Sequence, residues 1–182
     1  SPFQYFGIND NVDLEAAGVS WRRGFGYDTN ELSNVYTGND ARVALILEQM
    51  NHYVDDLNEM KAIGFCVSIE HAEYMAKKFN LVGIPSSAVT SKVSSEDRTQ
   101  TLNNFRNGII KAIFAVDIFN EGVDIPQCNQ VIFLRPTQSA IIFVQQLGRG
   151  LRRLEDREKY LTVIDFIGNY ENNFLIPVAL FG

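Results

Sequence analysis

The chain has 182 residues, enough for one domain of ordinary size with a short appendage. Acidic side chains outnumber basic ones by 22 to 16, and the net charge of −6 argues against a basic coat that binds nucleic acid regardless of sequence. Apolar residues form 46% of the chain in short runs, which excludes a transmembrane helix of about 20 residues, and no signal peptide is recognisable. The two cysteines, Cys66 and Cys128, predict packed thiols in a reducing, cytoplasmic setting and exclude a disulfide scaffold or a four-ligand zinc site.

Residues 1–38 mix aromatic, glycine and asparagine residues without a regular period. They predict an irregular arm or linker that contains one short strand over 3–8. A helix is predicted over 41–57 because apolar side chains recur there on one helical face, and either Asn39 or Asp40 can cap it.

Beyond residue 60, short apolar segments alternate with helical ones. The predicted strands are 62–67, 86–89, 111–116, 130–134 and 160–165, and the predicted helices are 69–80, 95–106 and 137–154. This alternation predicts right-handed βαβ units and a parallel sheet covered by helices on both faces. In such sheets ligands bind beyond the carboxyl ends of the strands.

The segment 144–154 carries the clearest chemical signal. On a helix, Gln145, Arg149 and Arg152 form one stripe, whereas the apolar residues at 144, 147, 151 and 154 form another on nearly the opposite side. One face would pack on the sheet, and the other would present an amide and two guanidinium groups, which suit a polyphosphate. A solvated basic face paired with the acidic residues of 155–158 explains the stripe equally well.

The loop 117–126 follows a predicted strand at the edge where ligands are expected. Asp124 offers a ribose two hydrogen-bond acceptors, and Gly122 lets the backbone approach a bound group closely. A polar turn that only shapes the chain is the alternative for this loop.

Together, Gln-x-x-Gly-Arg-x-x-Arg at 145–152 and Asn-Glu-Gly-Val-Asp-Ile-Pro at 120–126 resemble motifs VI and V of superfamily-two helicases. Residues 62–68 with the following helix resemble motif IV, and 98–108 resemble the helix before motif V. This resemblance implies a RecA-like, P-loop-NTPase-like α/β domain of three αβα layers over 39–182. Residues 1–38 are then the arm that joins two motor lobes.

The resemblance also implies roles for single residues. Arg149 and Arg152 match arginine fingers that reach the γ-phosphate of ATP, and Gln145 matches a residue that contacts the phosphates or positions water. The implied ATP-binding set is Glu121, Gly122 and Asp124. The implied set for nucleic-acid phosphates is Ser68, Thr90, Ser91 and Asp117.

Two positions depart from the family pattern. Val116 stands where many relatives have Thr or Ser, which removes a hydroxyl that would contact the nucleic-acid backbone. Gln145 stands where DEAD-box RNA helicases carry His, which favours a DNA-directed motor of the restriction or repair type.

The sequence has no Gly-x-x-x-x-Gly-Lys-Ser/Thr and no Asp-Glu pair, which belong to the first lobe in this family. Because the chain also begins with Ser1 instead of Met, we expect the second lobe alone, inactive by itself. ATP and its Mg²⁺ would then depend on the first lobe of the same polypeptide. The alternative is a non-catalytic nucleic-acid-binding or partner-docking module that keeps the motor fold.

The remaining polar residues carry ordinary interpretations. Both histidines, His52 and His71, are expected to be ordinary residues on helix faces. Lys77 and Lys78 are expected to be solvated, and no metal site of the chain's own is expected. Arg135 either braces the helix predicted over 137–154 or contacts a phosphate.

Overall fold

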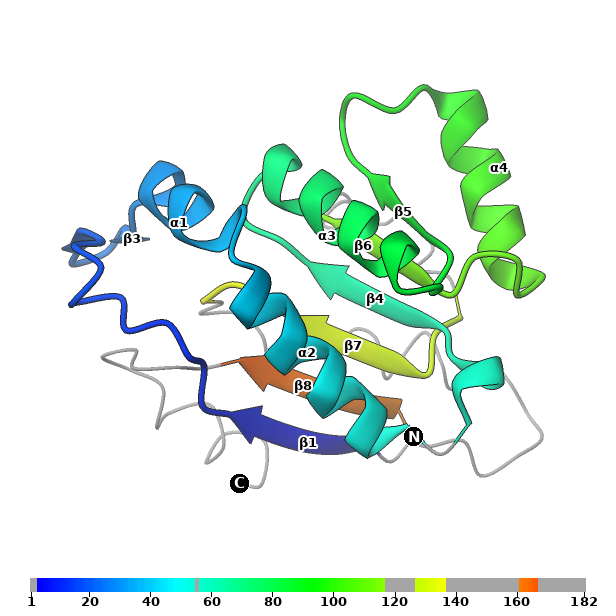
Figure 1. Ribbon diagram of the computed structural model, residues 1–182. Helices are drawn as coiled ribbons and strands as arrows, with labels where there is room; N and C mark the ends of the chain where they lie inside the picture. The colour runs from blue at the N-terminus through cyan, green and yellow to red at the C-terminus, as the bar shows by residue number, and fades with distance from the viewer. Residues whose placement is uncertain (1–2, 55, 117–126, 137–160, 167–182) are drawn as a thin grey trace.

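In the computed structural model, residues 3–54, 56–116, 127–136 and 161–166 are described. Their main feature is a six-stranded parallel sheet in the order β1-β8-β7-β4-β6-β5, with every arrow pointing to the same edge (Figure 1). The strands are β1 (Phe3–Ile8), β4 (Ala62–Phe65), β5 (Ser86–Val89), β6 (Ala112–Ala115), β7 (Gln130–Phe133) and β8 (Leu161–Phe166). The predicted parallel sheet is therefore confirmed.

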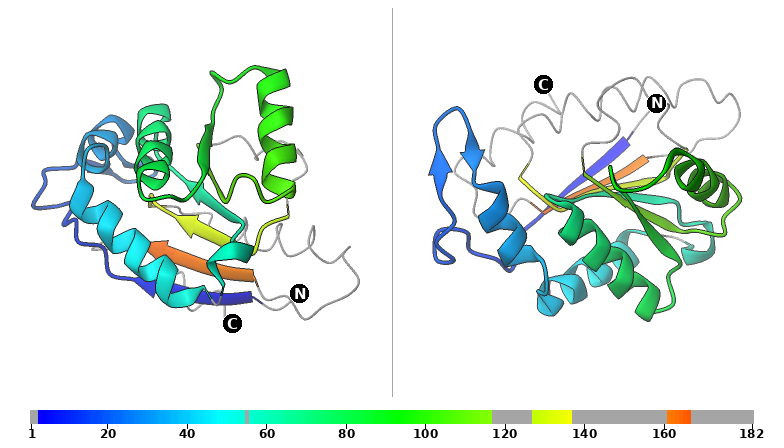
Figure 2. Two further views of the ribbon diagram at one scale, coloured as in Figure 1. Left: turned by 45° about the vertical axis from the view of Figure 1, so that its right-hand side comes forward. Right: turned by 90° about the horizontal axis from the view of Figure 1, so that it is seen from above.

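Helices cover both faces of this sheet. On one face lie α2 (Asp40–Tyr53) and α3 (Ile69–Leu81), and on the other lies α4 (Ser95–Arg106) (Figure 2). Successive residues of β4 point to opposite faces of the sheet, and both faces are apolar. Ala62 belongs to the core under α2 and α3, whereas Ile63 belongs to the core that contains Phe105 of α4. The three-layer RecA-like arrangement is confirmed. Within the described part of the chain, no helix combines the length and apolarity needed to cross a bilayer.

Side chains at the helix starts fix where these helices begin. The Asn39 Oδ1 accepts from the Arg42 N–H at 3.0 Å, and the Ser68 and Ser94 hydroxyls cap α3 and α4 in the same way at 3.1 Å. The predicted extension of the α2 helix to residue 57 is wrong. The helix ends at Tyr53, and Asp56 caps a separate 3-10 turn, η1 (Leu57–Glu59).

The N-terminal region is more regular than its composition predicts. The strand predicted over 3–8 is present as β1, and it forms the edge of the main sheet beside β8. Residues predicted to be irregular form a hairpin of β2 (Trp21–Arg22) and β3 (Gly26–Tyr27), followed by α1 (Thr29–Tyr36). Leu32 and Tyr36 of α1 pack with Leu14 and with Val67, which follows β4.

Candidate functional site

The predicted nucleic-acid residues that the structure describes follow two strands of the parallel sheet. Ser68 comes after β4, and Thr90 and Ser91 come directly after β5, so all three lie toward the carboxyl edge of the sheet. The other predicted site residues lie outside the described residues: Asp117, Glu121, Gly122, Asp124, Gln145, Arg149 and Arg152. In the sheet, β6 lies between β4 and β5, and the 117–126 segment follows β6 in the chain.

Ser68 is engaged on two sides. Its hydroxyl oxygen accepts from the His71 N–H at 3.1 Å as the cap of α3, and it lies 2.6 Å from the Ser33 hydroxyl oxygen on α1. Glu70 stands in the first turn of α3, where the helix dipole favours a negative charge. Ser68 is half-buried, and its contacts with His71 and Ser33 hold its hydroxyl in place.

Thr90 and Ser91 differ in their exposure. The Thr90 side chain is buried and its hydroxyl accepts from the Lys92 N–H at 3.4 Å, while its carbonyl accepts from the Val93 N–H at 3.1 Å. Ser91 is exposed. Thr90 therefore shapes a turn that presents Ser91 to solvent.

A buried arginine, Arg42, is the functional candidate that the sequence analysis missed. Its side chain is 1% exposed, and its Nε donates to both carboxylate oxygens of Asp10, at 2.9 and 3.1 Å. Its Nη2 donates at 2.8 Å to the backbone carbonyl of Leu134, at the carboxyl end of β7. The guanidinium carbon also lies 3.8 Å from the centroid of the Tyr36 ring.

One sequence signal could have found Arg42. It stands four residues before the buried Ile46 and eight before the buried Met50, so it is in phase with the apolar stripe of α2. A charged residue on the buried face of a helix needs a partner inside the protein. The partner, Asp10, lies 32 positions away in the chain, which no local pattern indicates.

His71 lies beside this cluster, on the inward face of α3, and is fully buried. Its Nδ1 accepts from the Val67 N–H at 3.2 Å, and its ring lies 5.3 Å from that of Tyr36. Burial, and then the charges of Arg42 and Arg135, lower the pKa of His71 to about 3. The imidazole is therefore neutral at physiological pH.

Both cysteines are buried thiols, as predicted. Burial raises the pKa of Cys66 well above its usual value, although the Arg42 and Arg135 charges oppose the shift, and burial raises that of Cys128 to about 12. Arg135 itself is half-buried after β7.

The two lysines predicted to be solvated differ in their exposure and in their partners. Lys77 is exposed, as predicted. Lys78 forms an ion pair with Asp40 at 2.9 Å and is 28% exposed, so it is not simply solvated.

A second buried carboxylate, Asp165, lies in β8, on the face of the sheet that α4 covers. The Tyr5 hydroxyl donates to its Oδ2 at 2.7 Å, and Asp165 is 2% exposed. Burial raises the pKa of Asp165 to about 6, although the Tyr5 hydrogen bond acts in the opposite direction. Burial and the neighbouring carboxylate raise the pKa of Tyr5 as well.

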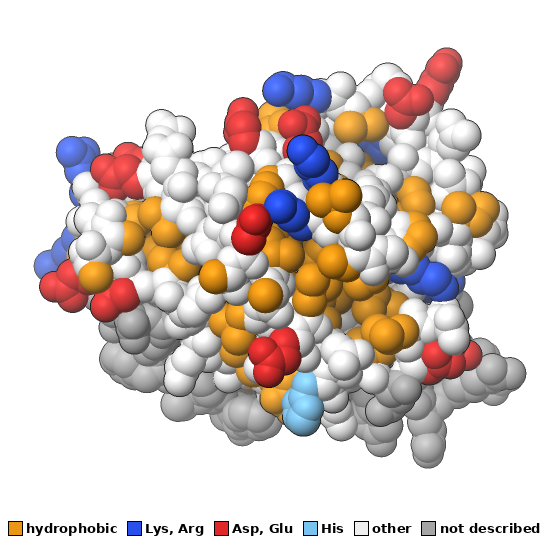
Figure 3. Space-filling view, viewed as in Figure 1, with side chains coloured by type: hydrophobic (Ala, Val, Ile, Leu, Met, Phe, Trp, Pro, Cys, Tyr) orange, Lys and Arg blue, Asp and Glu red, His pale blue; other side chains and the backbone are white. Residues whose placement is uncertain are grey.

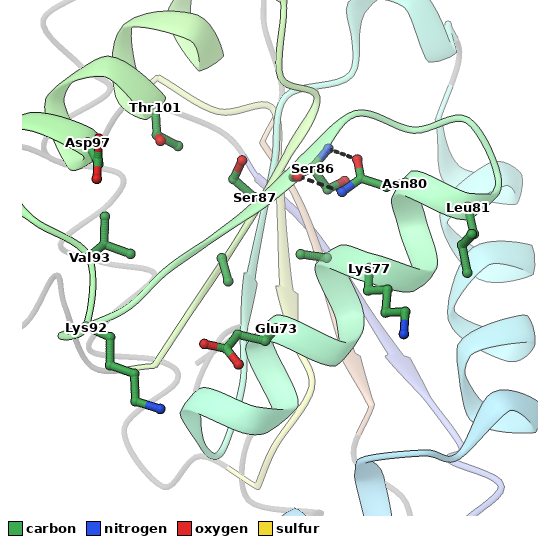
Figure 4. A pocket seen from close by; sticks show the side chains of 12 residues that line it. Glu73, Lys77, Asn80, Leu81, Ser86, Ser87, Lys92, Val93, Asp97 and Thr101 are labelled. Atoms are coloured by element: carbon green, nitrogen blue, oxygen red, sulfur yellow. Dashed lines mark hydrogen bonds between the residues drawn. The ribbon is translucent and has the colours of Figure 1, made fainter.

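A shallow groove of about 770 Å³ runs along β5 between α3 and the start of α4. Figure 4 shows Glu73 and Lys92 on opposite sides of it, and Asn80 bonded to the backbone of Ser86 at its far end. Positive and negative side chains are interspersed on the face that carries α2 and α3 (Figure 3). The groove and this face therefore lack the single-sign charge that a nucleic-acid channel uses.

Comparisons with known proteins connect this fold to one family. Residues 43–153 match the helicase conserved C-terminal domain. A 51.5 kDa protein of a Lactococcus phage is 29% identical over 170 residues, covering 93% of this chain and 35% of its own. The ATP-dependent RNA helicase DHH1 of Encephalitozoon cuniculi is 36% identical over 88 residues, covering 48% of this chain and 18% of its own.

The structural comparison agrees with the sequence match. The Pyrococcus furiosus Hef helicase domain superposes with a TM-score of 0.54 at 23% identity, covering 77% of this chain and 28% of that one. The chain thus spans about a third or less of the length of each of these relatives. It belongs to the helicase conserved C-terminal domain family and has the RecA-like fold of the second lobe of superfamily-two helicases.

Proposed function

We propose that this chain is the second motor lobe of an ATP-dependent DNA helicase or translocase, with the first lobe elsewhere in the same polypeptide. The observation that carries the proposal is the family match, because residues 43–153 contain both the 120–126 and the 145–152 motifs. The described strands support it, since the motif V segment comes after β6 and the motif VI segment after β7 in the chain, and both strands end at the carboxyl edge of the sheet.

In this proposal ATP binds between the two lobes. Arg149 and Arg152 stabilise the negative charge that develops on the γ-phosphoryl group, an effect of roughly 10³–10⁵ in rate in related systems. Gln145 contacts the phosphates or orients the attacking water, and the ribose-side contacts come from Glu121, Gly122 and Asp124. Among the described residues no three His, Cys, Asp or Glu side chains gather as a cation site, so this part of the chain offers Mg²⁺ no donor set. We assign the Mg²⁺ ligands to the first lobe.

The nucleic-acid contacts are proposed for Ser68, Ser91, Asp117 and the turn at Thr90. Ser91 is exposed and Ser68 is half-buried at the start of α3, where backbone N–H groups favour a phosphate. A lobe that holds phosphates of both ATP and nucleic acid moves when either ligand changes, and this couples hydrolysis to movement along the strand. Gln145 in place of the DEAD-box His is the reason to favour DNA over RNA.

Arginine substitutions in the complete polypeptide test this proposal. Arg149→Ala and Arg152→Ala should each lower DNA-stimulated ATP turnover at least about 10³-fold. The matched control is Arg106→Ala, at the exposed end of α4, which should leave turnover unchanged. Thermal unfolding should be alike in all three variants. Wild-type turnover in both finger variants would remove the assignment and favour a non-catalytic binding module.

Two simpler measurements separate the finer parts of the proposal. The 182-residue chain alone should hydrolyse no ATP, because it lacks the phosphate-binding lysine motif. Hydrolysis by the purified chain would contradict the assignment of that motif to another lobe. Single-stranded DNA should stimulate the complete polypeptide more than RNA of the same sequence, and the reverse order would overturn the DNA preference.

A further inference from the structure

The Arg42 side chain joins three separate parts of the chain inside the protein. Asp10 follows β1, Tyr36 ends α1, and Leu134 follows β7, and each contacts the same guanidinium group. Asp10 is as buried as Arg42, with 2% of its side chain exposed. Because both charges are removed from water, the pair is held in one geometry and does not exchange between solvent-exposed partners.

Leu134 is the point where this cluster meets the sheet. Its N–H donates to the Phe65 carbonyl of β4 at 3.0 Å, and its carbonyl accepts from Arg42 at 2.8 Å. Both backbone polar groups of Leu134 are therefore bonded to other elements. Three residues later the predicted helix over 137–154 begins, which carries the stripe of Gln145, Arg149 and Arg152.

We propose that Arg42 is a positioning residue for that stripe: it fixes the Leu134 carbonyl and so the direction in which the chain leaves β7 toward the motif VI segment. Asp10 orients the Arg42 guanidinium for this task. The proposal rests on the proposed function, because it assigns Arg42 a role in placing the arginine fingers.

This role has a kinetic signature. Fingers that are displaced by a small distance lose contact with the developing charge but leave ATP binding by other groups largely intact. Removing Arg42 should therefore lower kcat and change the KM for ATP little. A residue that only stabilises the fold would lower the amount of folded protein and leave the kcat of the folded fraction unchanged.

Substitutions in the complete polypeptide separate positioning from stability. Arg42→Met alone leaves Asp10 as an unpaired buried carboxylate, so it should lower the melting temperature. The double variant Asp10→Leu/Arg42→Met removes both charges and should recover most of that loss, while the Leu134 carbonyl still lacks its donor. We expect its DNA-stimulated kcat to be about 10-fold or more below wild type, with a KM for ATP within about twofold.

Further variants keep the proposal falsifiable. Arg42→Lys retains the charge but lacks the planar fork that reaches Asp10 and Leu134 together, so its kcat should lie between those of the double variant and the wild type. Lys77→Met, an exposed site on α3, is the control and should match the wild type. A double variant whose kcat recovers together with its melting temperature would overturn the positioning role.

Arg149→Ala is measured in parallel to tell the two proposals apart. If Arg149→Ala retains turnover, the finger assignment itself fails. If it loses turnover while Asp10→Leu/Arg42→Met keeps the wild-type kcat, only the role of Arg42 fails.

Discussion

The hydroxyl oxygens of Ser33 and Ser68 lie 2.6 Å apart, which joins α1 to the residue that caps α3. Ser68 does two things at this point, since it accepts from the His71 N–H and also contacts Ser33. The region before residue 38 is thereby attached to the motif IV segment of the lobe by a side-chain contact, in addition to the packing of Leu32 and Tyr36 on Val67.

The two serines should differ in their effect on stability. Ser68→Ala removes the cap of α3 and should lower the free energy of unfolding by about 1 kcal/mol or more. Ser33→Ala leaves that cap intact and should cost about 0.5 kcal/mol. Urea unfolding of both single variants and the double variant measures the difference and the coupling. A Ser33→Ala loss equal to that of Ser68→Ala would show that the cap is not the main contribution.

Gly64 in the central strand β4 should not tolerate a side chain. A Cβ at this position would lie 2.7 Å from Cδ1 and 2.8 Å from Cε1 of Phe114, whose ring packs edge-on against Phe79. Gly64→Ala should therefore lower the free energy of unfolding by about 1–3 kcal/mol through overpacking. Adding Phe114→Leu makes room, so the double variant should lose less than the sum of the single losses in urea unfolding. Strict additivity would contradict this account.

Asp165 should make the protein more stable at mildly acidic pH than at neutral pH. Its pKa is about 6 in the folded state and near 4 in the unfolded chain, so the folded protein binds the proton more readily. This contribution favours folding as the pH falls from 6 toward 4 and is absent above 6. Asp165→Asn should raise the free energy of unfolding by about 1–3 kcal/mol at pH 7.5 and by little at pH 4.

The Asp165 test uses urea unfolding at these two pH values. Tyr5→Phe is the matched control, because it removes the hydrogen bond to the carboxylate and should lower the free energy of unfolding at pH 7.5. An Asp165→Asn variant less stable than the wild type at pH 7.5 would contradict the prediction.

His71 should act in the opposite direction. Its pKa falls from about 6.5 in the unfolded chain to about 3 when buried, so the unfolded chain binds the proton first as the pH drops. Its contribution to stability is full above pH 6.5 and is lost progressively toward pH 3. His71→Gln should lower stability at pH 7.5, because Val67 loses its acceptor, but should flatten the decline between pH 6.5 and 4.5. Equal slopes for both proteins in urea unfolding would refute the neutral buried state.

Much of the fold could be predicted because its signals are local. The bounds of β1 and β5 agree with the predicted 3–8 and 86–89, and Asn39, one of the two predicted caps, caps α2 because a capping side chain bonds only three residues ahead. The helix α1 was missed because it buries only Leu32 and Tyr36, too few positions to show a period.

The hairpin before α1 was missed because it turns at Gly24 and Gly26, which adopt positive φ angles of 85° and 76°, and composition alone does not locate such turns.

The roles assigned to the motif V and motif VI residues stay predictions, because those residues lie outside the described part of the chain. The Arg42 cluster was missed for another reason. Its contacts join positions 32 and 92 residues apart, and such contacts follow from tertiary structure and not from a sequence pattern.

The pairing of β1 with β8 has a consequence for biosynthesis. Tyr5 leaves the ribosome among the first residues of this segment, yet its partner Asp165 is 160 positions later. The edge strand β1 therefore stays unpaired until β8 has been translated. Contacts between residues so far apart in the chain slow folding. Release of nascent chains before residue 166 should leave β1 available to chaperones or to proteolysis.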